Sequence, residues 1–385
     1  MKRKTIPRQV LILGFVSLFT DMASEMLYPV TPIFLTAVLG SSMAVVGIIE
    51  GIAEVTAGLL KGYAGSLSDK IGKRSIFVVI GYGLSAIAKP LPGIIPTIPA
   101  VVISRTTDRV GKGLRTAPRD ALLGSYADGN SGAIFGFHRG MDTLGAVIGP
   151  LLAILLLYIF PDNFQLIFLV AFVPSVCAVV FTLLVKDRKV PAKKRAQGSY
   201  IDFWKTTSSK YKSLLALITI FSFVNSSDVF LILKTKNIAD SSMLAILGYV
   251  FYNFIYALAS YPFGRLSDKH GKNIIYGGGL LVFSLVYFGF AILEETIFIW
   301  ILFALYGLYS AATEGISKAW VSDLVPDERR GSAIGLLTML SSFAIMLGSF
   351  TAGILWDKFG STIPFLLSAV VSLVIGMIIL AIKKS

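Results

Sequence analysis

Two carboxylic acids interrupt an otherwise apolar stretch near the start of the chain. In TDMASEMLYPVTP, Asp21 and Glu25 are four residues apart, and this spacing puts both side chains on one face of a helix. Carboxyl groups among apolar side chains can take up and release protons near neutral pH. The two acids are therefore candidates for proton coupling or solute contact, unless an arginine from another helix neutralises them permanently.

A more highly charged segment, RTTDRVGKGLRTAPRD, extends from Arg105 to Asp120. On a helix its charges fall within an arc of about 140°, which leaves the opposite face apolar. These charges belong to Arg105, Asp108, Arg109, Lys112, Arg115, Arg119 and Asp120. A loop has no reason to keep such a face, so we expect a transmembrane helix whose charges are covered by acids of the first two spans. Arg105 and Arg109 are therefore candidates for the cavity or coupling site.

Other apolar stretches carry further ionisable residues. Glu50, Glu54 and Lys61 fall within about 40° of one another on a helix and form one polar stripe, functional or structural. Lys89 has no obvious partner and is expected to extend outward from its helix. The remaining candidates for a cavity or coupling site are Arg139, Asp142, Asp228 and Glu314. Arg139 with Asp142, and Glu314 with Lys318, also have the spacing of structural ion pairs.

Composition indicates what must position these charges. The chain of 385 residues is 55% hydrophobic and only 15% charged, against about 25% charged in soluble domains. A soluble protein of this size could not bury so much apolar surface. Twelve apolar stretches have the length that a bilayer requires, roughly 18–25 residues. They are 8–37, 43–64, 75–97, 98–124, 132–158, 164–185, 212–234, 242–264, 274–293, 296–323, 331–356 and 361–382.

Lysine and arginine follow the topology of these spans. If the N-terminus is inside, most of the 35 Lys and Arg residues lie in the inner tails and loops, as the positive-inside rule requires. We therefore expect a multi-pass protein of a prokaryotic inner membrane with both termini cytoplasmic. The net charge of +13 reports this topology, and no nucleic-acid partner is expected.

The two halves of the chain repeat. GSLSDKIGKR, at Gly65–Arg74, recurs as GRLSDKHGKN, at Gly264–Asn273, about half the chain later. A duplicated six-span unit favours alternating access around a central site. We expect an N-terminal six-helix bundle at 1–185, a basic cytoplasmic linker at 186–211 and a C-terminal six-helix bundle at 212–385.

The duplicated loop resembles the signature loop of the major facilitator superfamily. This resemblance implies an all-α membrane fold of twelve transmembrane helices in two pseudo-symmetric bundles. It also implies that the loop is a conformational latch, in which Asp69 can cap a neighbouring helix N-terminus. The latch residues are Gly65, Asp69, Lys70, Gly72, Lys73 and Arg74, with Asp268 and Gly271 in the second copy.

Two shorter motifs bear on the direction of transport. Arg109-x-x-Lys112-Gly113 is similar to the superfamily's R-x-x-Q-G motif, with Lys in place of Gln. This resemblance implies that Arg109 faces Asp21 or Glu25 and takes part in proton coupling, with Arg105 as a second expected partner of these acids. Gly145-x-x-x-Gly149-Pro150 resembles its antiporter signature, although the second glycine pair of that signature is missing. The resemblance implies proton-coupled export of a small organic solute. The cationic fourth span favours the alternative, a proton-coupled transporter of an organic anion such as a carboxylate, phosphate ester or siderophore, working in uptake or export.

Other classes of protein are less consistent with the sequence. A membrane-embedded enzyme would need a nucleophile with its base or a metal cluster, and two histidines with one cysteine offer neither. A sensor would carry a soluble output domain. We expect no cofactor, with the proton gradient as the energy source, and a monomer whose partners are the solute, protons and membrane lipids.

Overall fold

A computed structural model describes residues 6–28, 30–41, 43–161, 163–188, 200–226, 228–239 and 242–382. All regular structure in these ranges is helical. Eight of the described helical segments are long and apolar enough to cross a membrane by length and composition alone. The segment with the charges between Arg105 and Asp120 is not among them, because a charged face lowers its hydropathy.

The helices up to the predicted linker are α1 (Arg8–Leu27), α2 (Val30–Ile33), the π-helix η1 (Phe34–Val38), α3 (Met43–Ile71), α4 (Arg74–Ala88), α5 (Leu91–Ile94), α6 (Ile98–Ser125), α7 (Ser131–Ile159) and α8 (Phe164–Thr182). They are followed by α9 (Tyr200–Thr206), α10 (Ser209–Val224), α11 (Val229–Ala239), α12 (Ser242–His270), α13 (Lys272–Ile292), α14 (Thr296–Asp323), the 3₁₀ helix η3 (Asp327–Arg329), α15 (Arg330–Phe359) and α16 (Thr362–Ala381).

The chain divides into two compact units. The first comprises 1–126, 141–206 and 326–339, and the second comprises 127–140, 207–325 and 340–385. The long helices α7 and α15 therefore each contribute their first turns to one unit and their remainder to the other.

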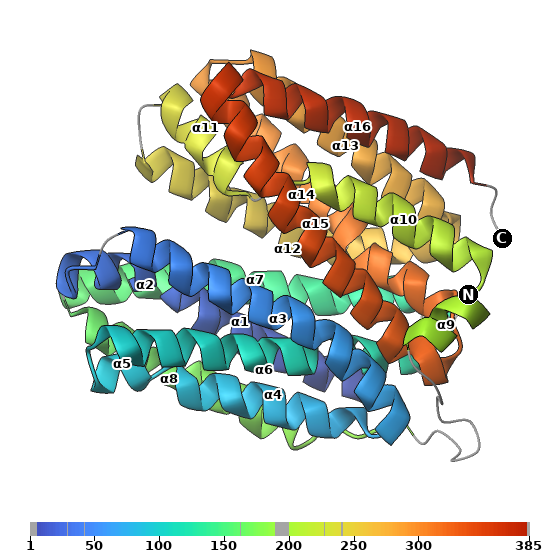
Figure 1. The fold of residues 1–385 in the computed structure, drawn as a ribbon, viewed down its shortest axis with the longest axis horizontal. Helices are drawn as coiled ribbons and strands as arrows, with labels where there is room; N and C mark the ends of the chain where they lie inside the picture. The colour runs from blue at the N-terminus through green and yellow to red at the C-terminus, as the bar shows by residue number, and fades with distance from the viewer. Residues whose placement is uncertain are drawn as a thin grey trace. The chain divides into compact units, whose positions relative to one another are not determined.

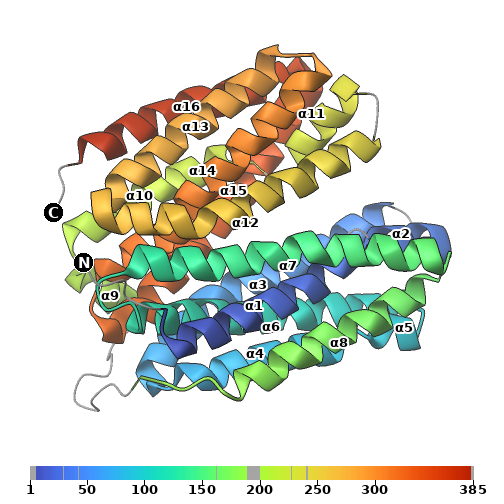
Figure 2. The ribbon, with the colours of Figure 1, turned by 180° about the vertical axis from the view of Figure 1, so that it is seen from behind.

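In the first unit, α6 packs between α3 and α4, and α1 packs along α8 (Figures 1 and 2). Apolar side chains of α1, η1, α6 and α8 form a core cluster that includes Met26, Phe34, Val101 and Phe168. Burying a side chain of this size contributes about 1.5–3 kcal/mol. This core fixes the rotation of α6 and decides which of its charges point at which neighbour.

In the second unit, α13 lies between α14 and α16, and α12 packs on α14 (Figure 2). Its core is aromatic, with Phe283 and Tyr287 stacked at 4.0 Å between ring centroids and Phe290 beside Phe303 at 5.7 Å. Aromatic pairs at such distances stabilise a core beyond their buried area.

Two predicted spans are interrupted. The span predicted at 8–37 is described as α1, which ends at Leu27, followed by α2 and η1, which extend from Val30 to Val38. The span predicted at 212–234 ends as α10 at Val224 and resumes as α11 at Val229. The four residues between them, NSSD, include neither glycine nor proline, so the sequence does not predict this break.

Candidate functional site

Two glycines of α7 bring its backbone against α1. A Cβ atom on Gly145 would lie 2.9 Å from Met22 N and 3.2 Å from Asp21 Cβ. A Cβ on Gly149 would lie 2.5 Å from Met22 O and 3.1 Å from Glu25 Cβ. Small residues one turn apart allow such close approach of two helices. The glycine motif of the fifth span therefore lies directly on the turns that carry the two acids.

A third acid joins this contact. The carboxyl groups of Asp21 and Asp142 lie within electrostatic and hydrogen-bonding range of each other, and Asp142 is 6% exposed. An ionised carboxylate can only accept a hydrogen bond, so a bond between two carboxyl groups requires a proton on one of them. Two carboxyl groups this close cannot easily ionise together. Such a pair can hold one proton between its two carboxyl groups, and its part in proton coupling stays a prediction.

Glu25 lies within electrostatic range of three cations of α6. Lys112 has the strongest electrostatic effect on the Glu25 carboxyl, followed by Arg109 and then Arg105. Lys112 is exposed, whereas Arg105 is buried. The structure thus brings the expected partners Arg109 and Arg105 near Glu25, and it adds Lys112.

The rest of the charged face of α6 bonds inside the bundle. Lys89 Nζ lies 2.9 Å from Asp108 Oδ1, with both residues buried. The prediction that Lys89 extends outward is therefore wrong, since its helix α4 packs on α6 and supplies a carboxylate one helix away. Ser104 Oγ donates to the Ala88 carbonyl at 2.7 Å in the same contact.

Two arginines in the C-terminal half of α6 also bond to α4. Arg115 donates to the Gly81 carbonyl at 3.2 Å, and its guanidinium lies 4.3 Å from the ring centroid of Tyr82. Arg119 donates to the Tyr82 hydroxyl at 3.2 Å and contacts Asp120 at 2.9 Å. The expectation that acids of the first two spans would cover this face holds in part, because Glu25 lies near three of its cations, whereas α4 contacts Asp108, Arg115 and Arg119.

Glu50 and Glu54 lie on a part of α3 whose side chains are outside the described residues. Their place in a cavity or coupling site stays a prediction.

In the second unit, Asp228 lies at the break between α10 and α11. The Tyr306 hydroxyl donates to Asp228 Oδ1 at 2.7 Å. Glu314 and Arg139 both act electrostatically on Asp228. Arg139 Nε donates to the Tyr256 hydroxyl, and its guanidinium lies 5.2 Å from that ring. The structure thus gathers three of the predicted site residues around one break.

The first copy of the repeated loop holds the start of α15. Asp69 accepts hydrogen bonds from Gly331 N at 3.1 Å and Ser332 N at 2.7 Å. A carboxylate in this position satisfies free N–H groups at a helix N-terminus. Gly65 permits the crossing, since a Cβ there would lie 3.0 Å from the Gly331 carbonyl carbon. Gly72 has φ +69°, which favours glycine.

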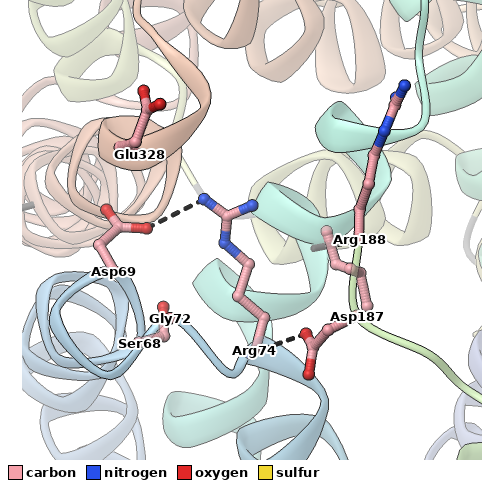
Figure 3. A pocket seen from close by; sticks show the side chains of 8 residues that line it. Ser68, Asp69, Gly72, Arg74, Asp187, Arg188 and Glu328 are labelled. Atoms are coloured by element: carbon pink, nitrogen blue, oxygen red, sulfur yellow. Dashed lines mark hydrogen bonds and ion pairs between the residues drawn. The ribbon is translucent and has the colours of Figure 1, made fainter. Parts of the chain in front are cut away.

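Arg74 is the centre of this latch (Figure 3). Its guanidinium contacts Asp69 at 3.1 Å and Asp327 at 3.2 Å. Asp187, which follows α8, accepts from the backbone N–H groups of Arg74 and Ser75 at 2.9 and 3.0 Å. Burial raises the pKa of the Asp69 carboxyl, while Arg74 opposes this effect. Lys70 and Lys73 are exposed.

The second copy repeats the geometry with different side chains. Asp268 accepts from Gly132 N and Ala133 N, at 2.9 and 2.8 Å, in the first turn of α7. Lys272 Nζ contacts Asp268 at 3.2 Å and Asp323 at 2.8 Å. Gly271 has φ +111°. That either copy works as a latch stays a prediction.

The family model of the Major Facilitator Superfamily matches residues 13–250 and 215–384. The chain belongs to the major facilitator superfamily. It is 34% identical over 383 residues to an uncharacterized MFS-type transporter of Methanocaldococcus jannaschii, an alignment that covers 98% of this chain and 95% of the relative. The family and fold class expected from the repeated loop are confirmed, and the chain is a multi-pass membrane transporter.

Solved superfamily structures have the same fold. The human organic anion transporter MFSD10 aligns with a TM-score of 0.82 at 15% identity, over 97% of this chain and 100% of that one. The Escherichia coli fucose:proton symporter aligns with a TM-score of 0.80 at 11% identity, over 98% of each chain. At these identities the likeness extends to the fold alone.

Sequence reasoning missed three features of this superfamily member. Lys89 and Asp108 could have been paired by noting opposite charges in spans 3 and 4. Asp187 gave no signal, since an acid at the start of a basic linker has no recognisable motif. The break before Asp228 had a weak signal in the sequence, which is the run of polar residues NSSD inside an apolar span.

Proposed function

We propose that this transporter is a secondary active exporter that moves a small organic solute out by alternating access in exchange for protons. The observation that supports the proposal is the close approach of the Asp21 and Asp142 carboxyl groups, set in the glycine contact between α1 and α7.

The energetics of this pair suit a coupling site. Loss of the shared proton would leave two negative charges roughly 4 Å apart, which repel by about 4 kcal/mol at an effective dielectric constant of about 20. About 4 kcal/mol changes a two-state equilibrium by roughly three orders of magnitude. Because the two acids lie on different helices, deprotonation favours a conformation in which α1 and α7 separate at this level.

The test is solute-dependent proton flux in proteoliposomes that contain a pH-sensitive dye. Phenethylammonium, 2-phenylethanol and phenylacetate serve as cationic, neutral and anionic probes of one shape. We expect flux with at least one probe, and its loss in Asp21→Asn, Asp142→Asn and Glu25→Gln. Asp128→Asn, an exposed loop position with φ 41°, is the matched control, because asparagine tolerates that backbone conformation. Normal coupling in all three acid variants would remove the pair from the mechanism.

A second candidate function is proton-coupled transport of an organic anion, inward or outward. It is favoured by Lys112, exposed on α6 beside Arg109 and Arg105, since such cations bind carboxylates and phosphates. The structural neighbour MFSD10 is an organic anion transporter. Proton flux with phenylacetate alone would select this function over cation export.

We further propose that the protein works as a monomer in a prokaryotic inner membrane, with both termini cytoplasmic. The inner-loop lysines and arginines support this orientation. The proton gradient would supply its energy without a cofactor, and the protein would catalyse no chemical reaction. Labelling of introduced terminal cysteines in inside-out and right-side-out vesicles tests the orientation.

A further inference from the structure

The break between α10 and α11 is unusual for a membrane-spanning segment. α10 ends at Val224 and α11 begins at Val229, although the intervening sequence contains neither glycine nor proline. Non-helical backbone at membrane depth is tolerated only where protein buries it or where it lines a cavity. The carbonyl end of a helix also carries a partial negative charge. The end of α10 therefore favours a cation, whereas the start of α11 favours an anion and is preceded directly by Asp228.

Two side-chain acceptors lie at this break. Asp228 accepts one hydrogen bond from Tyr306 through Oδ1, at 2.7 Å. Asn225 Oδ1 is buried and accepts no hydrogen bond within the described part of the chain. Buried acceptors are nearly always satisfied in folded proteins. A carboxylate and an amide oxygen thus remain available to a ligand that donates hydrogen bonds.

Tyrosine rings from three helices surround the carboxylate. Tyr306 of α14 lies 4.8 Å from Tyr252 of α12 and 6.3 Å from Tyr287 of α13, between ring centroids. Tyr309 lies 5.2 Å from Tyr306. The charge of Asp228 acts on Tyr252, Tyr287 and Tyr306. Faces of tyrosine rings attract ammonium groups, and alkyl substituents on the nitrogen pack well against them.

We propose that the α10–α11 break binds the ammonium group of an organic cation, and that the exported solute belongs to this class. Asp228 and Asn225 accept its N–H groups, and Tyr252, Tyr287 and Tyr306 present their rings to its carbon atoms. An inorganic cation such as Na⁺ would use the same oxygen atoms, so the test must separate the two sources. The inference rests on the proposed export function, but it concerns the solute and not the proton.

The test is calorimetric titration of the purified full chain in detergent with phenethylammonium, phenylacetate and Na⁺. We expect phenethylammonium to bind, and Asp228→Asn to weaken it about tenfold, the loss expected for one charge-assisted hydrogen bond. Tyr306→Phe keeps the ring and removes the hydroxyl, so it should weaken binding about threefold. Asn225→Asp adds a negative charge and should tighten phenethylammonium binding about threefold. Asp128→Asn should bind as the unmodified chain does.

The outcomes are distinct. A purely structural role for these residues predicts no gain in Asn225→Asp, so tightening supports the site even if Asp228→Asn fails to fold. Binding of Na⁺ without phenethylammonium would make the break an inorganic cation site and overturn the assignment, as would tighter binding of phenylacetate. Asp142→Asn should still bind phenethylammonium while losing proton flux. Because binding and proton flux are measured separately in this variant, failure of the cation site can be distinguished from failure of the proposed export function.

Discussion

Replacing Gly149 with alanine should uncouple transport from protons. A Cβ atom there would lie 2.5 Å from Met22 O and 2.9 Å from Met26 N, where ordinary contacts begin at 3.4 Å. Both neighbours are backbone atoms of α1, so no side-chain rotation can relieve the overlap. The helices must separate by about 1 Å at this turn, and such overpacking costs about 1–3 kcal/mol.

The same shift acts on the acids. If the two helices separate by about 1 Å, a donor–acceptor distance of about 2.7 Å increases beyond the range in which hydrogen bonds form. Asp21 and Asp142 can then no longer share a proton. We expect Gly149→Ala to lower solute-dependent proton flux about tenfold in proteoliposomes, the loss of one charge-assisted hydrogen bond. Its unfolding midpoint in detergent should fall as well.

The matched control is Gly83→Ala. Gly83 lies inside α4 with no atom within 4 Å of a built Cβ, so alanine should stabilise that helix by about 0.5–1 kcal/mol and leave the flux unchanged. If Gly149→Ala and Gly83→Ala show the same proton flux and the same unfolding midpoint, then the close packing of α1 and α7 does not hold the two carboxyl groups together.

Three further outcomes follow from buried contacts. Lys89→Met leaves Asp108 buried without its ammonium partner and should destabilise the chain by about 3–5 kcal/mol. The double variant Lys89→Met with Asp108→Leu should recover most of that stability, because no buried charge is left unpaired. Thermal unfolding in detergent measures both variants. Asp187→Ala removes the carboxylate that caps α4 and should cost about 0.5–2 kcal/mol, with Asp187→Asn less affected, and an equal loss in both variants would contradict capping. Asp69→Asn keeps the shape but loses the charge opposite Arg74, so it should unfold earlier than Asp128→Asn by about 1.5–3 kcal/mol, which the same melting curves would show.

Sequence patterns within single helices and loops predicted much of the fold. The fourth span was predicted at 98–124 and α6 extends over Ile98–Ser125, because the periodicity of its charges is a property of one helix. The loop glycines were predictable for a similar reason, since Gly72 and Gly271 adopt positive φ that other residues avoid. The duplicated motif then identified the superfamily without knowledge of any contact.

Contacts between helices were much harder to predict. Periodicity shows that α6 has a charged face, but only packing shows that Lys89 of α4 meets Asp108 and not the membrane surface. Asp142 was expected beside Arg139 from its spacing, and the contact with Asp21 depends on two glycines one turn later. The break at Asn225–Asp228 contains no residue that forbids a helix, so tertiary contacts must decide it.

The two copies of the repeated loop hold their helices with different side chains, which predicts an order in time if both copies act as latches. Arg74 binds its carboxylates through a rigid planar fork, and the side chains of Arg74 and Asp69 are 7% and 0% exposed. Lys272 holds the second copy through a flexible ammonium, and its partner Asp323 is 42% exposed. Water and salt screen the pair of Lys272 and Asp323 more strongly, so we expect the second copy to release before the first.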